Sequence, residues 1–124
     1  MKIRIKGNTI RFRLTKPEVE YFGKEGFIQE KTEFGKNSFS YAVRTAETGN
    51  TISAEFSGGS ITLFVPKHFA NEWVMTDRVG FESEMEIGGQ KKLFLKLEKD
   101  YKCLDEVSED QGDQYENPLA GKKS

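Results

Sequence analysis

Residues 51–65 read TISAEFSGGSITLFV, and their alternation of apolar and polar side chains predicts a β-hairpin. A two-residue loop at the central glycines places Phe56 opposite Ile61 and Ala54 opposite Leu63, so apolar side chains meet at both steps. Two strands that bury one shared face require this kind of pairing. The stretch therefore predicts a hairpin that contributes one apolar face to the core.

The same alternation continues through most of the first hundred residues. A three-residue loop at residues 88–90 places Phe81 opposite Leu97 on one face and Glu82 opposite Lys96 on the other. The strand-like runs are residues 2–6, 10–14, 27–34, 38–45, 51–56, 60–65, 79–87 and 91–98. The pattern therefore predicts about eight strands joined by short turns.

Two segments interrupt the alternation and predict short helices. The first begins with Thr15 as a capping residue, followed by a proline and a glutamate, and we expect Gly23 to end it. The second runs from Pro66 to about Met75, with apolar side chains at the spacing of one helix face. No internal repeat is visible in the sequence.

Length and composition limit the architecture. The 124 residues fit one domain, and ten Phe, four Tyr and one Trp supply bulky side chains for one core. We predict a mainly β (α+β) domain over residues 1–103: an antiparallel meander of about eight strands, barrel-like or strongly curled, with two short helices. Residues 104–124 are predicted to be an acidic, irregular or disordered tail, because residues 105–116 carry six acids and no cation.

The sequence also indicates a reducing compartment. It has no apolar run long enough for a signal peptide or a membrane span. Its single cysteine, Cys103, cannot form an intramolecular disulfide or a multi-cysteine metal site. We therefore expect a cytoplasmic protein that does not bind membranes, and the net charge of −1 gives no general indication of nucleic-acid binding.

The N-terminal hairpin concentrates positive charge on one face. A two-residue loop at residues 7–8 places Arg4 opposite Arg11 and Lys2 opposite Arg13, and like charges placed opposite each other destabilise a strand pair. The candidate anion-binding residues on this face are Lys2, Arg4, Lys6, Arg11 and Arg13. Three explanations are open: the cations are solvated, they pair with acids of the same chain, or they bind an anionic ligand.

The strand at residues 79–87 carries a ladder of carboxylates. Glu82, Glu84 and Glu86 share one face, and carboxylate oxygens are ligands that suit Mg²⁺ or Mn²⁺. The facing strand carries Lys92 and Lys96, which favours cross-strand ion pairs instead of a metal site.

The remaining candidates for chemistry are isolated residues. His68 is the only histidine, and Cys103 has no partner at a catalytic spacing, so we assign no catalytic residue and expect no cofactor. Aromatic residues between cations can form a platform for nucleic acid, but Phe12 faces the core by alternation. Phe64 and Phe94 fall on faces away from the core, where each could equally pack beneath a helix, so nucleic acid is not an expected partner.

The strands with alternating cations and those with alternating glutamates resemble, in outline, the strands of triphosphate-tunnel enzymes. In that family, inward cations hold a triphosphate and inward glutamates hold the metal. The family's early motif Glu-x-Glu-x-Lys is replaced here by Lys2-Ile3-Arg4-Ile5-Lys6, so no catalytic residue is carried over.

Three stretches together resemble an uncharacterised family of small bacterial proteins, a domain of unknown function. They are KIRIKGNTIRFRLTKPEVEYF at residues 2–22, TLFVPKHFANEW at residues 62–73, and FLKLEKDYKCLDEVSEDQGDQYENP at residues 94–118. The resemblance covers nearly the whole chain and implies a bacterial, cytoplasmic protein, but it implies no activity or ligand.

The sequence leaves three functions open and does not decide whether the protein is an enzyme. The first is a non-catalytic binding or interaction module with a protein partner or a small anionic ligand, since no catalytic motif is present. The second is a binder or hydrolase of a phosphorylated small molecule, such as a polyphosphate or nucleotide, that uses the basic hairpin face. The third is a nucleic-acid-binding protein. We also expect residues 105–116 to fold over the basic face and to compete with an external anion.

Overall fold

The computed structural model describes residues 1–101, which form eight strands and two helices. In chain order the elements are β1 (Lys2–Lys6), β2 (Thr9–Leu14), α1 (Lys16–Glu25), β3 (Phe27–Glu33), β4 (Ser38–Ala46), β5 (Ser53–Ser57), β6 (Ser60–Pro66), α2 (Lys67–Met75), β7 (Gly80–Gly88) and β8 (Lys91–Lys99). The predictions of a mainly β chain and of two short helices are confirmed. The predicted tail at residues 104–124 lies outside the described residues.

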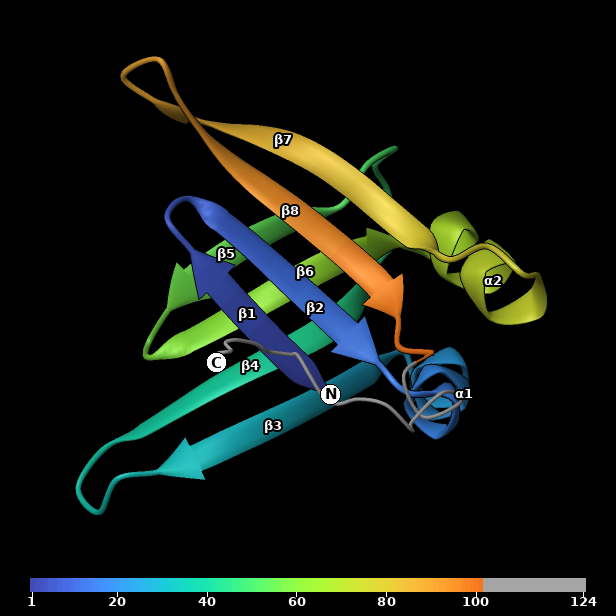
Figure 1. Ribbon diagram of the computed structural model, residues 1–124, viewed down its shortest axis with the longest axis horizontal. Helices are drawn as coiled ribbons and strands as arrows, with labels where there is room; N and C mark the ends of the chain where they lie inside the picture. Colours follow the sequence, from blue (N-terminus) through green and yellow to red (C-terminus); the bar gives the residue numbers. More distant parts are fainter. Residues whose placement is uncertain (102–124) are drawn as a thin grey trace, which may run out of the picture.

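The strands form two four-stranded sheets whose inner faces share one core (Figure 1). Sheet 1 has the strand order β1-β2-β8-β7, and sheet 2 has the order β3-β4-β6-β5. The central pairs, β2 with β8 and β4 with β6, are parallel, whereas the outer pairs are antiparallel. The prediction of a single antiparallel meander is therefore wrong, and the two sheets do not close into a barrel.

The prediction is correct for the strand register within each hairpin, but it is wrong about which hairpins lie next to each other in a sheet. The predicted registers are confirmed, since Phe56 lies opposite Ile61 and Phe81 lies opposite Leu97. However, α1 carries the chain from sheet 1 to sheet 2, and α2 carries it back. The first hairpin is consequently joined in its sheet by the last hairpin instead of by the next one.

The chain contains a structural repeat, although no repeat is visible in its sequence. Each half has the order strand, strand, helix, strand, strand: first β1-β2-α1-β3-β4, and then β5-β6-α2-β7-β8. The pairing repeats too, because Phe12 lies beside Leu97 in sheet 1 as Leu63 lies beside Val43 in sheet 2. The repeat preserves apolar character and register more than residue identity, so the sequence alone does not reveal it.

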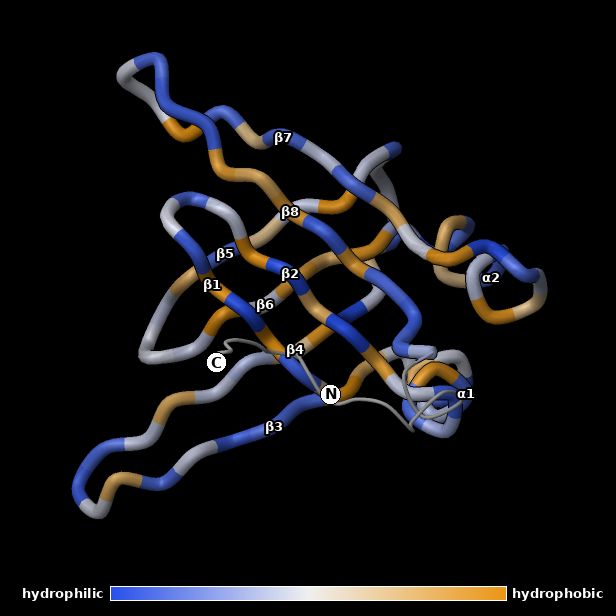
Figure 2. The backbone as a smooth tube through the Cα atoms, in the orientation of Figure 1, coloured by the Kyte–Doolittle hydropathy of each residue, from blue (hydrophilic) through white to orange (hydrophobic). Residues whose placement is uncertain are grey.

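Alternating burial along the strands builds the core. Figure 2 shows hydrophobic and hydrophilic positions alternating along the strands of both sheets. On β2, Ile10, Phe12 and Leu14 are buried, while the residues between them point to the outer face of the sheet.

Both helices lie at one end of the two sheets (Figure 1), where Phe22 of α1 meets Trp73 of α2 edge to face. Neither helix within residues 1–101 is long and apolar enough to cross a membrane.

The end of α1 also differs from the prediction. The helix continues past Gly23 to Glu25, and Gly26 ends it with a left-handed backbone at φ 73°. Gly23 serves the packing of the two helices instead, because a Cβ at this position would lie 2.9 Å from both methyl groups of Val74 on α2. A glycine inside this helix is thus explained by the close approach of α2.

The start of α1 is the capping box that the sequence predicts. The backbone N–H of Thr15 donates to Glu18 Oε1 at 2.8 Å, and Glu18 Oε2 pairs with the N-terminal ammonium of Met1. Burial raises the pKa of Glu18, but the hydrogen bonds and the charge of the ammonium outweigh burial and leave the pKa below its ordinary value.

Candidate functional site

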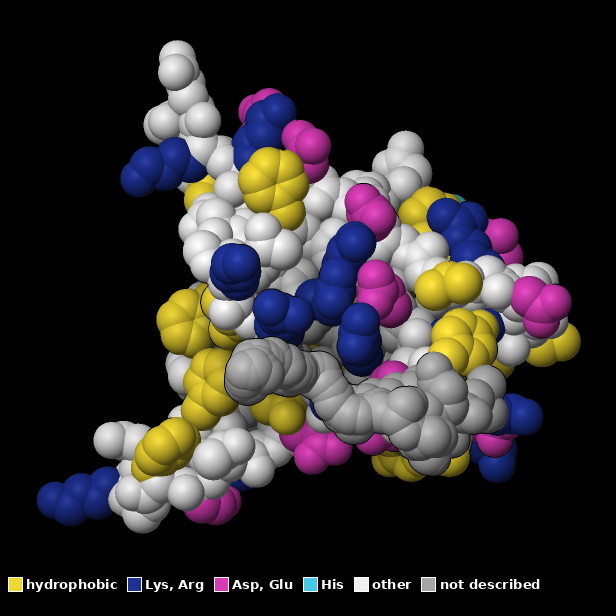
Figure 3. All heavy atoms as spheres, in the orientation of Figure 1, with side chains coloured by type: hydrophobic (Ala, Val, Ile, Leu, Met, Phe, Trp, Pro, Cys, Tyr) yellow, Lys and Arg dark blue, Asp and Glu magenta, His cyan; other side chains and the backbone are white. Residues whose placement is uncertain are grey.

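The outer face of sheet 1 carries most of the charged residues that the sequence singled out. The register of the four strands arranges their outward-facing positions in three rows across β1, β2, β8 and β7. The rows are Lys6-Thr9-Phe94-Glu84, Arg4-Arg11-Lys96-Glu82 and Lys2-Arg13-Glu98-Gly80. Figure 3 shows the cations gathered on this face, with acidic side chains along one side of them.

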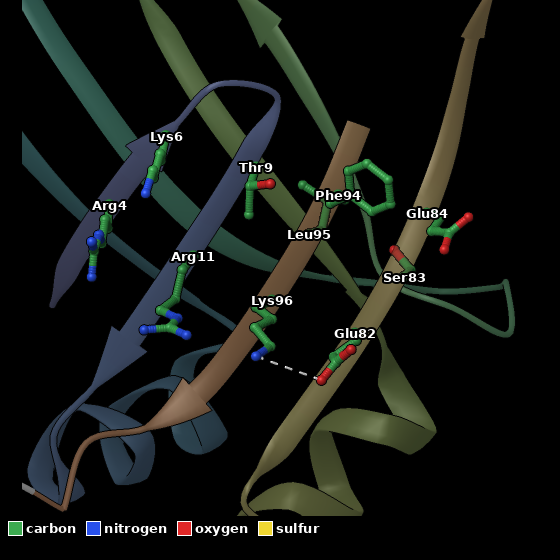
Figure 4. Close-up of a pocket in the computed structure, with 10 residues that line it drawn as sticks. All are labelled: Arg4, Lys6, Thr9, Arg11, Glu82, Ser83, Glu84, Phe94, Leu95 and Lys96. Carbon is green, nitrogen blue, oxygen red and sulfur yellow. Dashed lines mark ion pairs between the residues drawn. The ribbon is translucent and has the colours of Figure 1, made fainter. Parts of the chain in front are cut away.

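The first two rows surround a hollow of about 640 Å³, which we call the basic hollow. Its lining residues are Arg4, Lys6, Thr9, Arg11, Glu82, Ser83, Glu84, Phe94, Leu95 and Lys96 (Figure 4). The volume is in the range of sites that bind small molecules. The cations of β1, β2 and β8 line one side of the hollow, and the carboxylates of β7 line the other (Figure 4).

The structure divides the five predicted anion-binding residues into two groups. Arg4, Lys6 and Arg11 line the basic hollow, whereas Lys2 and Arg13 belong to the third row and do not line it. The predicted register is confirmed, with Arg4 opposite Arg11 and Lys2 opposite Arg13. The like-charge pairs that the sequence predicted are therefore present on this face.

Acids of the same chain pair with three of the five cations. Lys2 Nζ lies 3.2 Å from Asp100 Oδ2, and Arg13 Nε donates to Glu98 Oε1 at 3.3 Å. Arg11 Nε lies 3.8 Å from the same Glu98 oxygen, so one carboxylate serves two guanidinium groups.

The other two cations, Arg4 and Lys6, have no such partner. Within residues 1–101, neither side chain forms an ion pair or a hydrogen bond, and both are exposed. Pairing among the described residues thus accounts for only part of the positive charge, and it leaves these two cations beside Arg11 in the basic hollow.

The glutamates of β7 are mainly partners of lysines. Glu82 Oε2 lies 3.7 Å from Lys96 Nζ, and Lys92 Nζ donates to Glu84 Oε1 at 3.2 Å. Glu86 lies at a bulge near the end of β7 and does not line the hollow. Among the described residues, no group of three His, Cys, Asp or Glu side chains is arranged to hold a metal ion. Glu82 and Glu84 thus form the cross-strand ion pairs that the sequence favoured over a metal site.

Sequence reasoning did not propose five of the residues that line the basic hollow: Thr9, Ser83, Phe94, Leu95 and Lys96. Phe94, Leu95 and Lys96 belong to β8, and they lie beside the cations of β2 only because β2 pairs in parallel with β8, which joins residues from the two ends of the described chain. Phe94 was placed on a face away from the core, and this placement is correct because the ring is 43% exposed. Alternation gives the face of each residue, but no local signal indicates that β8 is the neighbour of β2.

The structural repeat provides a comparison for the basic hollow within the same chain. The equivalent positions of sheet 2 have the same strand geometry, but they hold one acid and two hydroxyl groups in place of three cations: Glu55 for Arg4, Ser57 for Lys6 and Thr62 for Arg11. This strand arrangement therefore forms without a cluster of cations. The charge on sheet 1 is a property of that face and not a requirement of the fold.

Two other features lie away from this face. The His68 ring on α2 packs edge to face against Phe69, with 4.6 Å between the ring centroids, and Cys103 lies outside the described residues. A second hollow of about 370 Å³ opens between the hairpins of β1-β2 and β5-β6. Apolar side chains dominate its lining, including Ile5 and Phe56, which are 54% and 70% exposed.

Comparison with known proteins identifies a family but not a function. Residues 1–119 match the model of a family of unknown function (DUF7009). No curated protein and no solved structure matches the chain.

Proposed function

The chain belongs to this family of unknown function, and we propose that it is a non-catalytic binding module whose basic hollow holds a phosphorylated small molecule. The observation that carries the proposal is a pair of cations, Arg4 and Lys6, that have no ion-pair partner within residues 1–101 and lie beside Arg11 in one hollow. A phosphate group offers several acceptor oxygens, and guanidinium groups bind such oxygens through paired hydrogen bonds.

The electrostatics of the face favour an anionic ligand. Arg4 and Arg11 lie directly opposite each other, which costs the free strand pair stability. A bound anion would offset this repulsion, so part of the binding energy comes from the charge of Arg4, which pairs with no acid in the described part of the chain. The absence of cations at the equivalent positions of sheet 2 supports a specific role for this face.

Binding is favoured over hydrolysis by the groups that line the hollow. Its carboxylates, Glu82 and Glu84, are each paired with a lysine, and the nearby hydroxyls of Thr9 and Ser83 have no histidine beside them in the lining. A hydrolase would need a base or metal poised toward a reacting phosphorus atom. A phosphate-release assay on the same ligands tests this distinction, and we expect no release above the uncatalysed rate.

The first test of the proposal is a thermal-shift comparison at constant ionic strength. Phosphate, pyrophosphate, tripolyphosphate and nucleotides are compared with sulfate, each with and without Mg²⁺. A ligand at ten times its Kd adds about 1.4 kcal/mol to the free energy of unfolding, which raises Tm by roughly 3–8 °C for a domain of this size. A shift that grows with the number of phosphates supports the proposal, whereas equal responses to all anions contradict it.

A pair of charge-matched variants assigns the effect to the basic hollow. Arg4→Gln/Arg11→Gln removes two positive charges from the hollow, and Lys31→Gln/Lys36→Gln removes two exposed charges from β3 and the following turn. We expect the first variant to lose the ligand-induced shift and the second to keep it. Equal loss in both variants would indicate general charge attraction instead of a site.

A further inference from the structure

We infer that the phosphorylated ligand is a nucleotide whose base stacks on Phe94 while its phosphates contact the cations of β1 and β2; this inference rests on the proposed function. The proposed function does not explain why an exposed aromatic residue, Phe94, lines the basic hollow. It belongs to the interior strand β8 of sheet 1, points to the outer face, and is 43% exposed in the lining of the basic hollow. An aromatic ring open to a cationic hollow offers a stacking surface for a base.

The ring is not needed for the core. The neighbouring residues Leu95 and Leu97 supply the buried side chains of β8, at 2% and 0% exposure, while Phe94 faces away from them. The equivalent position in sheet 2 is Ser40, which forms a hydrogen bond with Ser60 across the strands. The repeat thus builds the same strand pair without an aromatic residue at this point.

The spacing between the ring and the cations suits a nucleotide. Phe94 shares a row with Lys6, two strands away, so their backbones are about 10 Å apart at ordinary strand spacing. Arg4 lies one row farther, about 12 Å from Phe94 by the same geometry. Arg11 lies between them. A nucleoside di- or triphosphate extends over a comparable length from its base to its last phosphate.

The distribution of charge in the hollow gives the ligand a direction. Glu84 lies directly opposite Phe94 on β7, and Glu82 occupies the same edge in the next row (Figure 4). Lys96 and Lys92 pair with these carboxylates, whereas Arg4 and Lys6 have no ion-pair partner within residues 1–101, so the attraction for phosphate groups is strongest on the β1 side. The hollow therefore favours a molecule with one anionic end and one uncharged aromatic end. Inorganic polyphosphate has the anionic end but no aromatic end.

The test measures ATP and inorganic tripolyphosphate by isothermal titration calorimetry on the full chain and on two variants, Phe94→Ala and Phe94→Trp. Stacking of one base on an aromatic side chain strengthens binding by about 5- to 150-fold, so wild type should bind ATP more tightly than tripolyphosphate by that factor. Phe94→Ala should abolish the difference without changing the affinity for tripolyphosphate. Phe94→Trp should retain the difference, which separates loss of stacking from a general structural effect.

The outcomes separate this inference from the proposed function. If ATP and tripolyphosphate bind wild type and Phe94→Ala equally, the base site is wrong but the anion site stands. If neither ligand binds, the proposed function fails. A ten-nucleotide single strand of DNA tests the other source of stacked bases. If it binds far more tightly than ATP, and in a Phe94-dependent way, the mononucleotide assignment is overturned in favour of a single-stranded nucleic acid.

Discussion

Replacement of Arg4 by glutamine should weaken ligand binding and at the same time stabilise the free protein. Arg4 is exposed, lies directly opposite Arg11, and has no ion-pair partner within residues 1–101. Like charges at directly opposed positions cost a strand pair about 0.2–1 kcal/mol. Glutamine keeps the length and polarity of the side chain but removes the repulsion, so the free energy of unfolding should rise by about that amount.

The two effects have measurable sizes. A gain of 0.2–1 kcal/mol corresponds to an increase in Tm of roughly 1–5 °C, measured by urea denaturation and calorimetry at low salt. The gain should shrink in 1 M NaCl, because the screening length falls to about 3 Å. Loss of a hydrogen bond between charged groups should weaken the binding of tripolyphosphate by about 10- to 100-fold.

The control for Arg4→Gln is Lys36→Gln, which removes one exposed cation from the turn between β3 and β4. We expect it to change neither Tm nor affinity by more than a small amount. The reasoning would be refuted if Arg4→Gln lowered Tm at low salt, since Arg4 would then have a stabilising partner. It would equally be refuted if tripolyphosphate bound this variant as tightly as wild type.

Three further predictions concern packing, pH and the C-terminal charge. Gly23→Ala should lower the free energy of unfolding by about 1–3 kcal/mol in urea denaturation, because the new methyl group would lie 2.9 Å from Val74. We expect this loss despite the higher helix propensity of alanine. The double variant Gly23→Ala/Val74→Ala should regain most of the lost stability. Folding lowers the pKa of Glu18, so the ionised Glu18 stabilises the folded protein fully above its unfolded pKa of about 4.3, and this contribution is lost as the pH falls through the lower folded pKa. Glu18→Gln should therefore flatten the dependence of the free energy of unfolding on pH in this acidic range and lower that free energy at pH 7. Truncation after Leu104 removes six acids and two lysines, so the affinity for tripolyphosphate should rise at low salt, and an unchanged affinity would show that this charge does not compete with the ligand.

Local features of the fold could be predicted from the sequence because they depend on neighbouring residues. The alternation around each glycine turn gave the correct registers, such as Arg4 opposite Arg11, and the capping sequence gave the start of α1. Long-range pairing could not be predicted in this way. Turn chemistry specifies which strands form a hairpin, but it does not specify that β2 lies parallel to β8. The single meander was the simplest continuation of the hairpins, and the two helices that cross between the sheets make it wrong.

The same distinction applies to the basic hollow. Arg4, Lys6 and Arg11 were placed on one face because they belong to one hairpin. Phe94 and Lys96 were assigned to the correct outer face of their own strand, but their position beside the cations depends on the pairing of β2 with β8. At Gly23 a local signal was misleading. A glycine near the end of a helix predicts a cap, but this glycine instead allows α1 and α2 to approach closely.

The most direct test of the central claim is an NMR titration of the ¹⁵N-labelled chain with tripolyphosphate. The claim predicts that the largest amide shifts occur on the outer-face rows of sheet 1, at Lys6, Arg11 and Lys96, with little change at the equivalent positions of sheet 2. The claim would be contradicted if no amide signals shifted at a saturating concentration of tripolyphosphate. It would also be contradicted if the amides of Ser57 and Thr62 in sheet 2 shifted as much as those of sheet 1.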